Sequence, residues 1–268
     1  MKDFLARFGL HTMPFTREFP IERRLSQPQF VEAEAGLHRA IEDRQSAALD
    51  APAGTGKSVV LRALKATLAE ARYRVHYVKV TCLSKRDMCR EVALAVGAEP
   101  AGSYNMLVRR LDERFLTTFD QDGLRPVLLL DEAHDLRPDV LAMLRILTNY
   151  EMDSRLVVSI VLAGQPGLRT MLRRDEHEDV ARRLAHFATL RPLSRQECVG
   201  YVEHRIAIAG GRCCPFDQSA LDALFEFGRG CMRATDQLAL KALQLAHDQN
   251  IDAVDAGLVV EARKVLWP

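Results

Sequence analysis

Long hydrophobic runs are missing from this sequence of 268 residues, although 48% of its residues are hydrophobic. The longest apolar stretch, Leu156 to Gly164, is far shorter than the roughly 20 residues that a membrane-spanning helix needs. At the N-terminus, Lys2, Asp3 and Arg7 interrupt the apolar residues, so the pattern of a secretory signal peptide is missing too. These absences predict a cytoplasmic protein that does not cross a membrane.

Metal-binding cysteine patterns and a strong net charge are also missing. The six cysteines form no Cys-x-x-Cys pair and no Cys/His cluster with zinc spacing, which predicts buried or unreactive thiols. The formal net charge is only +1, so the chain lacks the overall basic character of many nucleic-acid-binding proteins. Any DNA binding must then come from a local basic patch or from the assembly of several subunits.

The sequence does contain an alternation of short strand-like runs and longer amphipathic stretches, which is typical of a parallel sheet flanked by helices. The expected strands are 47–50, 75–80, 127–131, 156–164 and 187–193, and the helices between them are 59–71, 85–96, 105–119 and 139–150. The fold class is therefore α/β.

After Pro192 the strand pattern stops, and Ser194 with Glu197 forms a capping box that starts a helical region. Further helices are expected at 218–227, 232–247 and 254–265. We therefore expect an N-terminal extension with a linker helix over 1–45, a nucleotide-binding α/β domain over 46–193 and a small helical lid over 194–268.

A phosphate-binding loop is predicted at 51–58, where Ala-Pro-Ala-Gly-Thr-Gly-Lys-Ser follows an expected strand and precedes an expected helix. Gly54 and Gly56 allow backbone N–H groups to converge on phosphate oxygens. Lys57 can reach the β and γ phosphates of ATP, and Ser58 can ligate Mg²⁺. Ala51 replaces the first glycine of this Walker A pattern and leaves the rest intact. The expected nucleotide-binding residues of the loop are Pro52, Ala53, Gly54, Thr55, Gly56, Lys57 and Ser58.

A Walker B motif is predicted where the apolar strand 127–130 is followed by Asp131 and Glu132. Since parallel strands deliver such residues to the ligand-binding edge of a sheet, we expect Asp131 to hold Mg²⁺ through Ser58 or water. Glu132 would orient and deprotonate the attacking water.

Asp-Glu-Ala-His at 131–134 also spells the box of a helicase superfamily. Such helicases need two tandem nucleotide-binding domains, whereas the sequence shows one sheet-forming region. We therefore expect His134 to be a surface or helix-start residue and not a coupling element.

With these motifs the sequence resembles a branch of the AAA+ ATPases that contains the ExeA-type general-secretion ATPases and the TniB- and TnsC-type ATPases of transposons. The resemblance runs over nearly the whole chain. Its main motifs are Phe8-Gly9-Leu10 with Pro14-Phe15, and the segments 54–58, 130–133, 148–151, 161–169, 190–195 and 230–238.

The resemblance implies several further roles. It implies that Gln165, after the fourth strand, is the sensor 1 residue facing the γ-phosphate, and that Arg233 in the lid is sensor 2. It implies that Arg183 is the arginine finger that completes a neighbour's site in a ring or helical filament, with Arg182 as the close alternative. Pro14 and Phe15 either flank the adenine or belong to the core, and the sequence leaves this open.

In related ring-forming ATPases, the region of Lys85 and Arg86 lines the central pore and contacts DNA phosphates. Copies of these residues in an array would form a positive track for double-stranded DNA with little sequence preference. The alternative is a solvated helix start, because Ser84 and Asp87 suit an N-cap.

Three functions follow as expectations. The first is an ATP-dependent, DNA-binding oligomer that regulates DNA transposition and recruits or activates a transposase. The second is an ExeA-like ATPase that acts in assembly of an envelope complex, and the third is a DNA-independent nucleotide switch. ExeA-type proteins continue into a membrane helix and a peptidoglycan-binding region, whereas this sequence ends at Trp267-Pro268, so we expect the transposition role.

Overall fold

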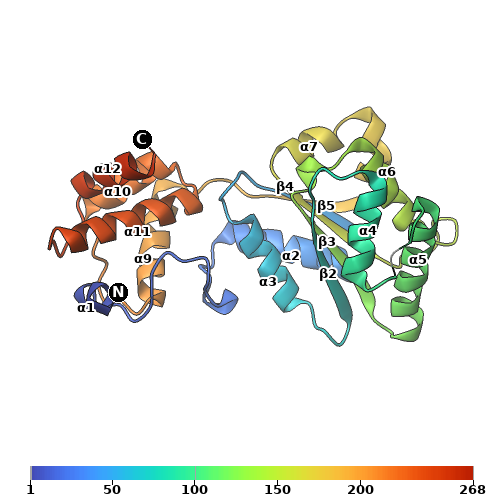
Figure 1. Ribbon diagram of the computed structural model, residues 1–268, viewed down its shortest axis with the longest axis horizontal. Helices are drawn as coiled ribbons and strands as arrows, with labels where there is room; N and C mark the ends of the chain where they lie inside the picture. The colour runs from blue at the N-terminus through green and yellow to red at the C-terminus, as the bar shows by residue number, and fades with distance from the viewer. Residues whose placement is uncertain (1, 100, 268) are drawn as a thin grey trace. The chain divides into compact units, whose positions relative to one another are not determined.

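The computed structural model describes residues 2–99 and 101–267. Met1, Pro100 and Pro268, which fall within the three expected domains, lie outside the described residues. The chain divides into two compact units (Figure 1). One unit combines Gln27–Pro52 with Lys57–Leu190, and the other combines the residues up to Ser26 with Ala53–Gly56 and the residues from Arg191. We call them the sheet unit and the helical unit.

The sheet unit contains a five-stranded parallel sheet, which confirms the α/β class. Its strands follow the spatial order β2-β3-β4-β1-β5, and every neighbouring pair is parallel. Because all five strands run in one direction, their carboxyl ends meet at a single edge. The strands are β1 (Ser46–Asp50), β2 (Tyr73–Lys79), β3 (Arg125–Asp131), β4 (Ser159–Gly164) and β5 (Leu184–Thr189).

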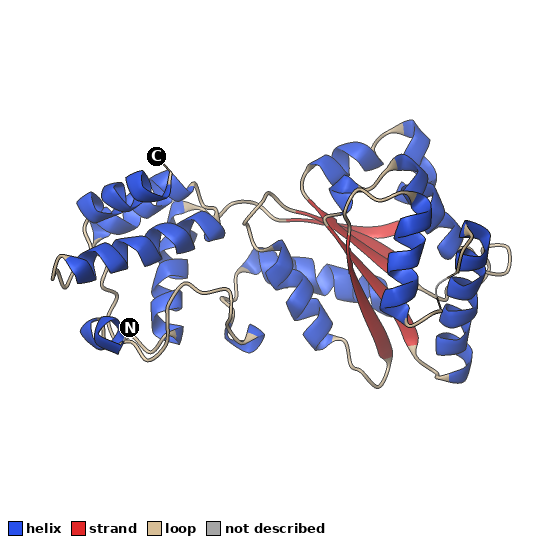
Figure 2. Cartoon of the chain, viewed as in Figure 1, coloured by secondary structure: helices blue, strands red, loops and turns tan. Residues whose placement is uncertain are grey.

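Helices cover both faces of this sheet (Figure 2). Leu128, Leu130 and Ile160 point to the face covered by α4, α5 and α6, and they share one core with those helices. The opposite face is covered by α2 and α3. The helices of this unit are α2 (Pro28–Glu42), α3 (Lys57–Thr67), α4 (Lys85–Val96), α5 (Tyr104–Leu116), α6 (Pro138–Leu147), α7 (Gly167–Leu172) and α8 (Glu178–Ala181). The short turns are η2 (Thr117–Gln121), η3 (Ala133–Asp135) and η4 (Asp175–His177).

Helix α4 has the predicted bounds because both of its ends carry strong local signals. The Ser84 side chain accepts a hydrogen bond from the backbone N–H of Asp87, and Gly97 ends the helix with a left-handed φ of 73°.

Two strands differ most from the predicted bounds, and the other three are within two residues of them at each end. β4 begins at Ser159 and not at Leu156, and β5 covers Leu184–Thr189, so the prediction of 187–193 was displaced toward the C-terminus. Leu190 and Leu193 are buried although they lie beyond β5. Apolar runs report burial, and burial does not require strand pairing.

The helical unit contains α1 (Lys2–Arg7), η1 (Ile21–Arg23), α9 (Arg195–Ile208), α10 (Gln218–Gly228), α11 (Met232–Asp248) and α12 (Ala256–Leu266). The predicted capping box is present, since Ser194 accepts from the N–H of Glu197 and the Glu197 side chain accepts from the N–H of Ser194. Phe15 is buried in the core of this unit and meets Phe216 edge-on, with ring centroids 6.0 Å apart. Of the two alternatives for Phe15, the core role fits this packing.

Candidate functional site

The predicted phosphate-binding loop joins β1 to α3. Gly54 and Gly56 have φ values of 76° and 108°, in the region that only glycine adopts without strain. A Cβ atom on Gly54 would lie 2.5 Å from the Sγ of Cys231. Within the helical unit, the N–H of Arg233 donates to the carbonyl of Gly54 at 3.2 Å, and the Cys231 thiol donates to the carbonyl of Ala53 at 3.4 Å. The start of α11 therefore holds the glycine-containing part of the loop.

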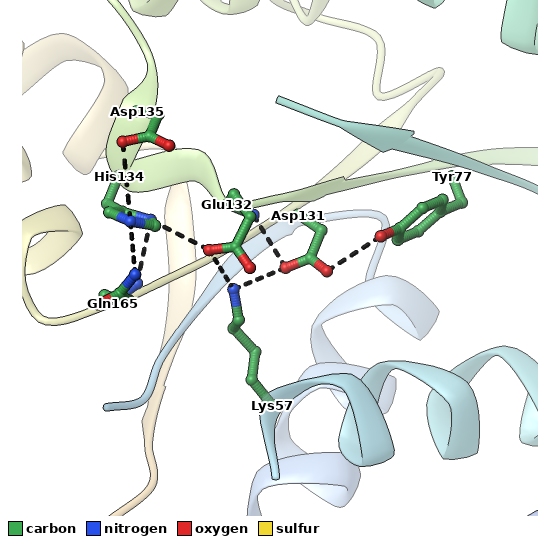
Figure 3. Close-up of polar contacts among 7 residues, drawn as sticks. All are labelled: Lys57, Tyr77, Asp131, Glu132, His134, Asp135 and Gln165. Carbon is green, nitrogen blue, oxygen red and sulfur yellow. Dashed lines mark hydrogen bonds and ion pairs between the residues drawn. The ribbon is translucent and has the colours of Figure 1, made fainter. Parts of the chain in front are cut away.

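Lys57 is the first residue of α3, and its side chain crosses to the end of β3 (Figure 3). The Nζ atom lies 2.7 Å from Oδ1 of Asp131 and 2.9 Å from Oε2 of Glu132. Lys57 and Asp131 are only 8% and 5% exposed. A buried ammonium needs such compensation, because removing a charge from water costs several kcal/mol.

Two further donors fix the carboxylate of Asp131. The backbone N–H of Glu132 donates to Oδ1 at 2.8 Å, and the Tyr77 hydroxyl on β2 donates to Oδ2 at 3.0 Å. Glu132 has a left-handed backbone with φ 58°, which turns the chain sharply after β3. Burial, followed by the charge of Asp131, raises the pKa of Tyr77 to about 12, so the phenol remains a donor at neutral pH.

His134 and Gln165 lie beside Glu132 (Figure 3). The Nε2 atoms of His134 and Gln165 are 2.8 Å apart, and the N–H of Gln165 donates to Nδ1 of His134 at 3.4 Å. Nδ1 of His134 also lies 3.5 Å from Oε2 of Glu132. His134 lies within the short helix η3, which begins at Ala133, and its contacts with Gln165 connect the carboxyl ends of β3 and β4.

A second polar cluster stands at the same edge, on β1, β5 and α7. The buried carboxylate of Asp50 accepts from the Thr189 hydroxyl at 2.7 Å and from Nη2 of Arg169 at 3.2 Å. Arg169 also donates to Thr189 and lies over the Phe187 ring. Asp50 directly precedes the phosphate-binding loop, so this cluster anchors the N-terminal end of the loop.

The donor set fits a Mg²⁺-bound nucleoside triphosphate. The loop glycines, the first turn of α3 and the Lys57 ammonium suit phosphate oxygens, and the Ser58 hydroxyl with the Asp131 carboxylate are hard oxygen ligands of the kind Mg²⁺ takes. Over 2–99 and 101–267, no group of three or more His, Cys, Asp or Glu side chains could hold a metal by itself. A Mg²⁺ ion would therefore need phosphate and water ligands as well, which is its usual preference beside nucleotides.

The predicted arginines make other contacts within their own units. Arg183 makes a bidentate ion pair with Asp153, at 2.7 and 3.0 Å, and Arg182 pairs with Glu178 at 2.6 Å. Both arginines line an open hollow of about 720 Å³. Arg233 is exposed on α11 of the helical unit.

Lys85 and Arg86 are both exposed at the start of α4. The ammonium of Lys85 lies 4.7 Å from the centroid of the Tyr104 ring. The Ser84 cap confirms a helix start here, which does not exclude phosphate contacts by the two basic side chains.

Three features of the site were not predicted from the sequence. They are the contact of Tyr77 with Asp131, the contact of His134 with Gln165, and the polar cluster around Asp50. For Tyr77, the sequence offers one signal. Side chains alternate between the two faces of a strand, so Tyr77 and Lys79 of β2 lie on the same face. Its meaning depends on the register between β2 and β3, which the sequence does not show.

Comparisons with known proteins identify the family and the fold of this chain. The chain matches the AAA domain family over residues 39–172, which include the loop, Asp131, Glu132 and Gln165. It is 31% identical over 241 residues to general secretion pathway protein A of Aeromonas hydrophila, and the match covers 88% of this chain but only 43% of that relative.

Two solved structures share the fold. Cdc6p from Pyrobaculum aerophilum has a TM-score of 0.73 at 18% identity, covering 94% of this chain and 70% of that one. The Aeropyrum pernix ORC1 protein in complex with DNA has a TM-score of 0.69 at 18% identity, covering 94% of this chain and 68% of that one.

Among the described residues, none of the helices combines the length and the apolar character needed to span a bilayer. The family match covers half of the sequence and contains Lys57, Asp131 and Glu132, which meet at the carboxyl edge of the sheet. The chain therefore belongs to the AAA domain family and has the fold of an AAA+ P-loop NTPase.

Proposed function

We propose that this chain is a Mg²⁺-dependent ATPase that hydrolyses ATP to ADP and phosphate at the site around Lys57. The observation that carries the proposal is the ammonium of Lys57, which is buried between the carboxylates of Asp131 and Glu132 at the carboxyl edge of the sheet. A cation in this place, next to a glycine loop and a helix N-terminus, suits a polyphosphate.

The protein's own residues suggest how the site would work. Phosphate oxygens would compete with the two carboxylates for the Lys57 ammonium, and this would release Glu132 to orient and deprotonate a water molecule. Mg²⁺, held by Ser58 and through Asp131, would neutralise charge on the phosphates. Gln165 would face the γ-phosphate as sensor 1, and Arg233 would serve as sensor 2.

The test of hydrolysis is Glu132→Gln, which keeps the size and polarity of the side chain but removes the base. We expect ATP affinity within about threefold of the parent and a turnover reduced on the order of 100-fold or more. Glu91→Gln, at an exposed position on α4, is the matched control. A Glu132→Gln variant that hydrolyses ATP at the parent rate would show that another group activates the water.

We also propose that ATP supports a homo-oligomer, a ring or helical filament, which binds double-stranded DNA and regulates transposition with a transposase in the cytoplasm. Lys85 and Arg86 support the DNA contact, because both are exposed at the start of α4. The similar fold of the ORC1 protein, solved in complex with DNA, is consistent with this activity.

The DNA contact can be tested by replacing Lys85 and Arg86 together with alanine. We expect weaker binding to unrelated DNA duplexes alike, and a salt slope lowered by about one per lost phosphate contact. The control pair is Arg109→Ala with Arg110→Ala on α5. An unchanged affinity and salt slope would exclude this contact, and ATPase activity that ignores DNA would favour a DNA-independent switch.

A second candidate is a role in assembly of an envelope complex, which the 31% identity to general secretion pathway protein A favours. This chain spans 43% of the length of that relative, so the relative's activity as a whole does not transfer. Affinity purification of the Glu132→Gln variant with ATP would distinguish the two roles. Recovery of a transposase supports the first, and recovery of envelope proteins supports the second.

A further inference from the structure

The carboxylate of Asp131 receives donors on both oxygens, and they come from different parts of the fold. The Nζ atom of Lys57 lies 2.7 Å from Oδ1, and the N–H of Glu132 donates to the same oxygen at 2.8 Å. The hydroxyl of Tyr77 donates to Oδ2 at 3.0 Å, from the opposite side of the carboxylate (Figure 3). Tyr77 is thus the donor that β2 supplies to a residue of β3.

The strand register explains why a tyrosine makes this contact. Lys79 pairs with Asp131 across the β2–β3 ladder, and Tyr77 stands two residues earlier on the same face of β2. Two residues of a strand span roughly 6.6 Å, which is about the length of a tyrosine side chain. A phenol lying along the strand therefore ends at the carboxylate, whereas a phenylalanine would bring no donor.

Burial supports a role for the hydroxyl and not for the ring. Tyr77 is 49% exposed, so its ring adds little to the core, while the carboxylate that it meets belongs to a residue 5% exposed. The hydrogen bond from its hydroxyl to Asp131 therefore explains why a half-exposed tyrosine stands at this position of β2.

We infer that Tyr77 is a positioning residue that holds Asp131 in the orientation needed for metal-dependent nucleotide binding. The inference rests on the proposed ATPase function. The terminal torsion of an aspartate has broad minima, and Oδ1 loses a donor if Lys57 turns to phosphate. The bond from Tyr77 to Oδ2, together with the bond from the Glu132 N–H to Oδ1, then restrains the carboxylate and keeps Oδ1 directed toward the nucleotide side of the site.

The test is Tyr77→Phe, which removes one oxygen and keeps the ring. Affinity for a fluorescent ATP analogue is measured by titration in Mg²⁺ and in EDTA, together with the Mg²⁺ concentration that gives half-maximal hydrolysis. We expect a loss of about tenfold in apparent Mg²⁺ affinity, as for other residues that orient metal ligands. Affinity in EDTA and the thermal unfolding midpoint should stay close to those of the parent.

Tyr73→Phe is the matched control, because Tyr73 lies on the same strand and its buried hydroxyl has no hydrogen-bond partner among the described residues. It should leave the Mg²⁺ dependence unchanged. Asp131→Asn tests the route of the effect. If Tyr77 acts through Asp131, adding Tyr77→Phe to Asp131→Asn should lower affinity no further.

Three results would overturn the inference: a Mg²⁺ dependence in Tyr77→Phe equal to the parent's, an equal loss in Tyr73→Phe, or additive losses in the Asp131→Asn background. In all three, the parent still binds nucleotide in a Mg²⁺-dependent way and the proposed ATPase stands. A parent whose nucleotide affinity ignores Mg²⁺ would overturn both proposals together.

Discussion

At the scale of single residues, the site is organised by charge balance around Lys57. One ammonium stands between two carboxylates, so the three groups carry a net charge of about minus one. Each carboxylate is also held by a contact of its own, Asp131 by Tyr77 and Glu132 by its position near His134. Removal of the ammonium should therefore affect both ligand binding and stability.

We predict that Lys57→Ala lowers ATP affinity on the order of 100-fold, because a charge-assisted contact to phosphate contributes about 3 kcal/mol at its upper end. The same change leaves two neighbouring carboxylates without their cation, so it should also lower the unfolding free energy by about 3 kcal/mol. Calorimetric titration with ATP and urea unfolding measure the two effects. Lys65→Ala, on the exposed side of α3, should change neither. Parent-like ATP affinity in Lys57→Ala would remove this loop from the proposed site.

The residues of the two motifs could be predicted because their roles depend on short stretches of chain. Lys57 follows Gly56 and opens α3, and Asp131 ends an apolar strand. Tyr77 could not be predicted, because its contact depends on the pairing of Lys79 with Asp131 across two strands. The contact between His134 and Gln165 likewise needs β3 and β4 to be neighbours.

At the scale of elements, the segment between α6 and β4 contains a strained turn. Glu151, Met152 and Asp153 are consecutive residues with φ values of 48°, 57° and 69°. Each left-handed residue other than glycine costs roughly 1 kcal/mol. Arg155 stabilises this turn through ion pairs with Asp120 and Glu151.

We predict that Met152→Gly stabilises the sheet unit. Met152 is 97% exposed, so the side chain gives up almost no packing, while glycine accepts a φ of 57° without strain. The gain should be below about 1 kcal/mol, because glycine also increases the entropy of the unfolded chain. Urea unfolding measures it. Met152→Val, which is β-branched, should destabilise instead, and equal stabilities of the two variants would contradict the strained turn.

Helices α9 and α11 are joined by a polar network of buried and partly buried groups. The Tyr201 hydroxyl donates to Asp236 at 2.8 Å, and Arg205 lies 3.8 Å from the same carboxylate. Burial raises the pKa of Asp236 to about 6, against the opposing effect of Arg205. The folded chain thus binds the proton more tightly than the unfolded chain, in which the pKa is near 3.8.

We predict that this group makes the helical unit less stable as pH rises from about 4 to about 6. In that window the folded state holds more protons, so the unfolding free energy falls with pH, by on the order of 3 kcal/mol in total. Asp236→Asn cannot titrate and should lose this part of the pH dependence. Thermal unfolding at several pH values compares the two chains, and identical slopes between pH 4 and 6 would contradict the raised pKa.

Element bounds were predictable where local chemistry decides them. Ser84 and Gly97 determine α4, and Ser194 with Glu197 determines the start of α9. The predicted range of β5 was displaced toward the C-terminus because Leu190 and Leu193 are buried although they lie beyond the strand. Helix α1 was not predicted at all, since six residues show too little periodicity, and its Phe4 is buried by residues far along the chain.

At the scale of the whole molecule, the division of the chain is non-local. The first residues, up to Ser26, belong to the helical unit with the residues from Arg191, whereas α2 belongs to the sheet unit. Arg7 pairs with Asp252 at 3.0 Å, and the side chain of Arg205 donates to the carbonyl of Thr16. Contacts across about 200 positions leave no mark in local sequence patterns, so this part of the organisation was not predictable.

The assembly model gives the last prediction, because Arg183 has a partner within its own chain. Its guanidinium is held by Asp153, so in an isolated subunit it has no role at a nucleotide. If it acts in a neighbour's site, Arg183→Ala should keep subunit ATP affinity, lower hydrolysis on the order of 100-fold and reduce ATP-dependent assembly. Light scattering with and without ATP, beside steady-state hydrolysis, measures both effects. Arg182→Ala is the neighbouring control, since Arg182 is exposed and pairs with Glu178 one turn earlier. A larger effect of Arg182→Ala would transfer the role to that residue, and a parent that stays monomeric with ATP and DNA would reject the assembly model.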